Sequence, residues 1–229
     1  MKKLIILAFI FSAFTIYSCS DSTSGNSNKD TPPSLPNLNL ASPPTDAPPE
    51  VYTEFQYTGV MLGPWMLWIG NIFDDIDAVR DGDTWVWTST NNDLTITIKA
   101  TVGDDDSIVW QMILDGSIGI LMYDNWLAME GYQSGDRKSS SWTFYQMNSE
   151  EVAFVSSCET DDDGNVICTF NFGMFSHEST ANADGSGSFL IYNNGNLLFE
   201  SHWDSSGNGW WKKYNSSGNE IAGGTWGSD

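Results

Sequence analysis

The sequence predicts an all-β domain: an antiparallel meander of about 10–12 strands forming a barrel or sandwich, with one short N-terminal helix. Short apolar runs alternate with turns rich in Gly and Asn along most of the chain. The 12 Phe, 11 Trp and 8 Tyr are residue types that pack well on a pleated sheet. Residues 51–229 are long enough for a single domain with a real hydrophobic core.

The first 18 residues predict a cleaved export signal. Lys2 and Lys3 precede an apolar run over 4–16, which is too short to cross a hydrocarbon core as a helix. The run ends in Ile16-Tyr17-Ser18-Cys19, which resembles the lipobox of bacterial lipoproteins. This resemblance implies cleavage before Cys19 and acylation of that residue. The alternative is an ordinary signal peptide with a chance cysteine.

An anchor at Cys19 places the protein in the bacterial cell envelope, with the lipid bilayer as its first partner. We favour the outer membrane or the cell surface over the inner membrane. Residues 19–50 carry seven of the eight prolines and many Ser, Asn and Asp residues. This composition predicts a disordered, extended tether between the anchor and the domain.

The charge balance excludes one class of partner. The whole chain has a net charge of −21, and removal of residues 1–18 takes away two lysines, which leaves −23. A surface this acidic repels phosphate backbones, so we expect no nucleic-acid binding. We expect a glycan or an envelope protein as partner instead.

The predicted helix spans 64–79. Trp65, Ile69, Ile72, Ile76 and Val79 follow Gly63-Pro64 at the spacing of one helix face, and proline is favoured at a first helical position. The competing interpretation is a strand over 66–69.

From Thr84 onward the apolar period changes to two. Trp85 and Trp87 share one strand face, and 94–102 alternates aliphatic residues with Thr and Lys. This alternation is typical of a strand with one buried face. Further strands are predicted at 108–114, 118–123, 142–147, 152–158, 166–175, 188–192, 197–203, 210–214 and 220–226.

Cys158 and Cys168 predict a disulfide across a hairpin. If Asp162-Asp163-Gly164 forms the loop, Cys158 faces Cys168 and Ser156 faces Phe170. The same register extends to Phe154 opposite Phe172 and Val152 opposite Met174. A disulfide suits an exported protein. The alternative is a reduced pair or a metal site.

A weak repeat ends the chain. Gly187…Tyr192…Gly195…Trp203 resembles Gly209…Tyr214…Gly218…Trp226, with one insertion in the second copy. Each copy predicts a hairpin with a tight Asn/Gly turn.

Acidic loops offer hard oxygen ligands, so Ca²⁺ is a candidate cofactor. The candidate ligands are Asp161, Asp163 and Asn165 in one loop and Asp104 and Asp106 in another. The alternative is that aspartate serves these turns through its own backbone hydrogen bonds.

No recognised catalytic motif occurs in the chain, so we expect a binding module rather than an enzyme. Indole rings on a rigid sheet suit sugar rings, which makes carbohydrate the favoured ligand. The candidate residues are Trp85, Trp87, Trp203, Trp211, Glu200 and His202. A hydrolase that uses acidic residues or His202 is one alternative.

A second alternative is a binder of small apolar ligands. Gly63-Pro64-Trp65, near the start of the meander, is similar to the Gly-x-Trp motif of lipocalin-like domains. That resemblance implies a barrel that holds an apolar molecule. It covers three residues and implies no specific binding residues.

Overall fold

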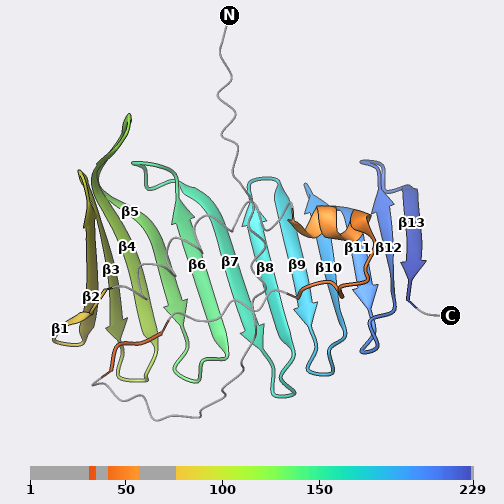
Figure 1. Cartoon of the computed structure of the whole chain (residues 1–229), viewed down its shortest axis with the longest axis horizontal. Coiled ribbons are helices and arrows are strands. Elements are labelled where there is room, and N and C mark those ends of the chain that lie inside the picture. The colour runs from red at the N-terminus through yellow and green to blue at the C-terminus, as the bar shows by residue number, and fades with distance from the viewer. Residues whose placement is uncertain (1–30, 35–40, 57–75, 228–229) are drawn as a thin grey trace, which may run out of the picture.

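A single antiparallel sheet forms the whole described fold (Figure 1). The computed structural model describes residues 31–34, 41–56 and 76–227. The strands follow one another in sequence order across the sheet. They are β1 (Val79–Asp81), β2 (Thr84–Asn91), β3 (Leu94–Val102), β4 (Ile108–Ile118), β5 (Leu121–Gln133), β6 (Ser139–Tyr145), β7 (Val152–Thr160), β8 (Val166–Phe172), β9 (Phe175–Ala181), β10 (Gly187–Asn193), β11 (Asn196–Trp203), β12 (Gly209–Tyr214) and β13 (Glu220–Trp226).

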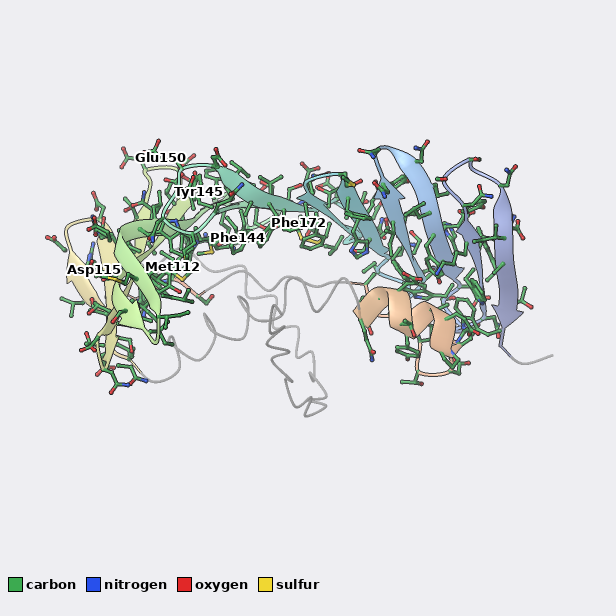
Figure 2. The ribbon with its side chains drawn as sticks, turned by 90° about the horizontal axis from the view of Figure 1, so that it is seen from above. Met112, Asp115, Phe144, Tyr145, Glu150 and Phe172 are labelled. Atoms are coloured by element: carbon green, nitrogen blue, oxygen red, sulfur yellow. A yellow bond between two sulfur atoms is a disulfide. The ribbon has the colours of Figure 1, made fainter. Side chains whose placement is uncertain are left out.

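The predicted fold class is confirmed: the chain is an all-β antiparallel meander with one short helix among the described residues. The sheet has 13 strands, and within the described part of the chain it is open, because β1 and β13 each pair with one neighbour. Figure 2 shows the sheet from above as an arch, with the helix on its concave side.

The short helix lies at 49–56, outside the range predicted for it. Of the predicted helix at 64–79, residues 64–75 lie outside the described residues, 76–78 are not helical, and β1 begins at Val79. The observed helix follows Pro48, whose carbonyl accepts a hydrogen bond from the Val51 amide at 3.0 Å. Proline has no backbone N–H, but the N–H groups of the first helical turn have no intrahelical acceptor. Proline at the start of a helix therefore costs no intrahelical hydrogen bond.

The packed part of the chain begins before residue 51. Ala41 is 3% exposed and Ala47 is 8% exposed, and both belong to a core cluster with Val51. Within the range predicted as a tether, residues 41–50 therefore lie against the sheet. The signal peptide, Cys19 and the rest of the tether fall outside the described residues, except for 31–34.

Two predicted strands have different bounds. The strand predicted at 118–123 is instead the end of β4, a turn at Gly119, and the start of the long strand β5. The strand predicted at 166–175 is divided by a turn at Gly173, so that β8 ends at Phe172 and β9 begins at Phe175.

Nearly all the buried side chains of the sheet lie on one side, which we call the packed face. Cross-strand partners such as Trp87 and Ile98, or Ile98 and Met112, place their side chains on the same face. The same alternation separates neighbours along a strand, as Figure 2 shows for Phe144 and Tyr145. We call the other side the open face.

Two core clusters cover most of the packed face. The first consists of buried residues of β2–β7, among which Ile98, Trp110 and Met112 are fully buried. The second joins Phe189, Phe199 and Trp203 to Ala41, Ala47 and Val51. The segment 41–56 thus supplies half of the buried members of the second cluster.

The predicted disulfide is present between β7 and β8. Cys158 and Cys168 are direct cross-strand partners, and Ser156 faces Phe170 as expected. The loop also agrees: the Asp161 amide donates to the Asn165 carbonyl at 2.9 Å, and Gly164 has a φ of 85°. The predicted pairing of Val152 with Met174 is wrong, because Met174 lies in the turn after β8.

The C-terminal repeat has a physical explanation in pairs of glycine and tryptophan. Gly187 lies directly opposite Trp203, and Gly209 lies directly opposite Trp226. A Cβ on Gly187 would lie 2.5 Å from the Trp203 ring, and one on Gly209 would lie 2.2 Å from the Trp226 ring. Each indole therefore fills the space above a glycine on the preceding strand, which compensates for the missing side chain.

Candidate functional site

The four tryptophans proposed for sugar binding do not form one surface. Trp85 and Trp87 lie in β2, whereas Trp203 and Trp211 lie in β11 and β12 near the other end of the sheet. Trp85, Trp87 and Trp203 are buried in the core clusters, and Trp211 packs against the second cluster. Their role in the described structure is to pack the sheet.

Glu200 and His202 do lie together, on the open face. Their side chains are 3.3 Å apart, and His202 stacks on Trp210 with 4.4 Å between ring centroids. The Tyr214 hydroxyl donates to Glu200, and this contact raises the pKa of Tyr214 to about 12. Neither Glu200 nor His202 lines the pocket described below.

The acidic loops use their carboxylates to build turns. Asp161 accepts hydrogen bonds from the amides of Asp163 and Asn165, both at 2.9 Å, and from the Asn165 side chain at 2.8 Å. These contacts, the Asn165 side chain first, lower the pKa of Asp161. In the other loop, Asp105 accepts from Ser107, while Asp106 occupies a position with a φ of 61°. This is the chemistry for which turns select aspartate.

The described residues contain no group of three or more His, Cys, Asp or Glu side chains that could hold a metal ion. Of the candidate calcium ligands, Asp161 and Asp163, which share a loop with Asn165, and Asp104 and Asp106 are therefore not part of such a group. Within the same described ranges, we find no helix with the length and apolar character needed to span a membrane.

An apolar pocket lies at β7–β12, beside the helix 49–56. Its volume is about 450 Å³, within the range of sites that hold small molecules. Its walls are mainly aromatic and aliphatic. The lining residues are Glu54, Phe154, Phe170, Asn171, Phe172, Phe175, Ser176, His177, Ile191, Leu198, Phe199, Lys213 and Tyr214.

The pocket has an exposed apolar rim. Phe172 and Phe175 face each other across the turn between β8 and β9, and they are 45% and 43% exposed. Aromatic side chains this exposed on adjacent strand ends are available for contact with a bound molecule.

His177 is the buried polar member of the lining. It is 5% exposed, and neither ring nitrogen has a hydrogen-bond partner among the described residues. Burial lowers the pKa of His177 to about 4, so the imidazole is neutral near pH 7. A neutral imidazole offers one donor and one acceptor.

The charged members of the lining pair with each other. The Lys213 ammonium donates to a Glu54 carboxylate oxygen at 2.8 Å, which ties β12 to the helix 49–56.

No family model matches the chain. A search of curated proteins also finds no match.

Sequence reasoning did not select the residues of this pocket. His177 is in β9, a strand without the usual alternation of apolar residues, because its buried positions are filled by His177 and Ser179. Glu54 belongs to a segment next to the proline-rich region. One available signal was the isolated histidine between the apolar runs of β8 and β10.

Proposed function

We propose that this protein is a lipid-anchored ligand-binding module of the bacterial envelope, and that it holds a small apolar molecule in the pocket at β7–β12. The observation that carries the proposal is the pocket itself, with its volume of about 450 Å³ and its mainly aromatic lining. Burial of apolar ligand surface there contributes about 25 cal/mol per Å². We favour a small apolar ligand over a carbohydrate, because the four candidate tryptophans do not share a surface.

Saturable binding of a neutral fluorescent aromatic amine such as 1-aminoanthracene tests the proposal. The chain is produced from residue 19 onward with Cys19→Ala, which removes the signal segment, the acylation site and the need for detergent. We expect one equivalent of probe to bind, with a blue-shifted and enhanced emission. Absence of saturable binding would reject the pocket as a ligand site.

Two exposed rim residues provide the variant. We expect Phe172→Ala combined with Phe175→Ala to weaken probe binding at least about tenfold, since each ring contributes apolar contact. Tyr132→Ala is the matched control, because Tyr132 is 43% exposed and lies in β5, away from the pocket. Equal losses in the variant and the control would contradict the assignment.

The anchor is tested separately. Metabolic labelling with palmitate is expected to modify the natural chain and not the Cys19→Ala variant. An unlabelled natural chain would remove the lipoprotein part of the proposal and leave the pocket untouched.

A second candidate function, glycan binding, is favoured by the cluster on the open face. Trp210, His202 and Glu200 combine an indole ring with polar groups in contact with one another. Lys212 adds a cation 5.8 Å from the Trp210 ring. A glycan array with the full chain, repeated with Trp210→Ala, tests it. Binding that survives this substitution would exclude the cluster.

A further inference from the structure

His177 occupies a place that a phenylalanine would fill in the packing of the sheet. Along the packed face, Phe170 stacks on His177 with 5.7 Å between centroids, and His177 meets Phe189 edge-on at 5.5 Å. Phe189 then stacks on Phe199, which stacks on Trp211. The row is aromatic from β8 to β12, and His177 is its imidazole member. Packing alone therefore gives no reason for the two ring nitrogens.

The burial of these nitrogens is unfavourable unless something pairs with them. A buried polar group without a partner costs about 1–3 kcal/mol, and such groups call for an explanation. The hydroxyls of Ser179 and Ser201 are also buried without a partner among the described residues, but they do not line the pocket. His177 does line the pocket, so of these three residues it is the one that lies beside a bound molecule.

The charges around the pocket indicate a neutral ligand. Lys213 is already paired with Glu54, and the neighbouring Lys212 is paired with Glu220 at 3.1 Å. The chain as a whole carries −21, which opposes the approach of anions. A neutral hydroxyl or carbonyl group satisfies an imidazole nitrogen without needing a counter-charge.

We infer that the ligand of this pocket is a neutral, largely apolar molecule with one hydroxyl or carbonyl group, and that His177 binds this group. The inference rests on the proposed function, because it assigns the ligand chemistry of the same pocket. His177 then acts as a specificity residue: it selects among apolar molecules of similar size by their single polar group.

The test compares naphthalene with 1-naphthol, which share a ring system and differ by one hydroxyl. Affinities are measured by displacement of 1-aminoanthracene from the chain that begins at residue 19 with Cys19→Ala. Each is corrected for the water-to-octanol transfer of the ligand. After this correction, we expect 1-naphthol to bind about twofold to tenfold better, the range of one net hydrogen bond.

In His177→Phe, we expect the corrected preference for 1-naphthol to disappear while naphthalene still binds. His202→Phe is the matched control, since His202 is the other histidine of the chain and lies on the open face. The control is expected to keep the preference. Thermal unfolding of His177→Phe is measured in parallel, and we expect an unchanged or higher Tm.

Each outcome has a separate meaning. If no probe or naphthalene binds to the natural pocket, the proposed function fails. If both ligands bind but the preference is absent, or persists in His177→Phe, the pocket stands and the role of His177 is rejected. A lower Tm in His177→Phe would show that the imidazole has a structural partner. This result would also reject the proposed role of His177 in ligand binding.

Discussion

The two ends of the sheet bury their packed faces by different means. In the first cluster, all the buried members come from β2–β7, and large side chains such as Trp110 and Trp142 cover one another. In the second cluster, Phe189, Phe199 and Trp203 need Ala41, Ala47 and Val51 from the N-terminal segment. Among the described residues, the buried members of the first cluster thus all come from strands, with Ile76 and Ala78 packed against them, whereas the second cluster depends on a segment distant in sequence.

The pocket lies where these two arrangements meet. Phe154 belongs to the first cluster, Phe199 belongs to the second, and both line the pocket. Between them lies a small cluster of Cys158, Cys168 and Phe170. The disulfide thus holds β7 to β8 at a point where only a small apolar cluster packs around it. The pocket therefore lies at the boundary between the first and the second cluster.

The largest effect is expected for Trp110→Ala. Trp110 is fully buried in the first cluster and packs near the rings of Trp87 and Trp142. Large-to-small substitutions of this kind cost about 3–5 kcal/mol. Urea unfolding measures the loss. A loss below about 1 kcal/mol would show that the first cluster does not carry the stability of the sheet.

The next effect is expected for loss of the disulfide. Cys158→Ser with Cys168→Ser opens a loop with a sequence separation of 10, and we expect a loss of about 2–3 kcal/mol. Reduction of the natural chain is the control and should give a similar loss. A double variant as stable as the natural chain would mean that β7 and β8 are held by packing.

A smaller effect is expected for Val51→Ala. Val51 has 0% exposure and joins the helix 49–56 to the second cluster. Removal of two methyl groups costs roughly 1.5 kcal/mol at about 0.8 kcal/mol per group. Hydrogen exchange should show faster opening of β10–β12 and unchanged protection of β3–β4. Equal acceleration in both places would contradict the separation of the two clusters.

The smallest effect on stability at neutral pH is expected for His177→Phe. The difference in stability between this variant and the natural chain increases as the pH falls. The pKa of His177 falls from 6.5 to about 4 on folding, so the unfolded chain takes up a proton first as pH falls. Stability therefore decreases between about pH 6.5 and 4. Unfolding of the natural chain and His177→Phe at pH 7 and pH 4.5 should show the larger decrease in the natural chain. Parallel curves would reject a neutral buried imidazole.

The sequence predicted the regular part of the fold because period-two patterns are local. The alternation of 94–102 and the turn at Gly164 each depend on a few neighbouring residues, and both are confirmed. Strand β9 was missed because His177 and Ser179 fill its buried positions and conceal the alternation.

The helix and the pocket depend on contacts that no local pattern contains. The proline-rich composition around 43–49 favoured a disordered interpretation, yet Tyr52 donates to the Pro44 carbonyl at 2.6 Å and Phe55 meets Phe189. The candidate tryptophans were identified by residue type alone. Their burial follows from the pairing of strands, which decides whether an indole faces a neighbour or solvent.

The contact between Glu54 and Lys213 joins residues that are 159 positions apart, whereas the strands pair only with their immediate neighbours in the chain. Hairpins close short loops and form early, but this contact closes a long loop. We therefore expect the meander to assemble progressively, hairpin by hairpin. The N-terminal segment completes its contacts only when β12 is present, so a chain truncated before β12 would keep its hairpins and its packing on β10 and β11 but lose the Glu54–Lys213 pair.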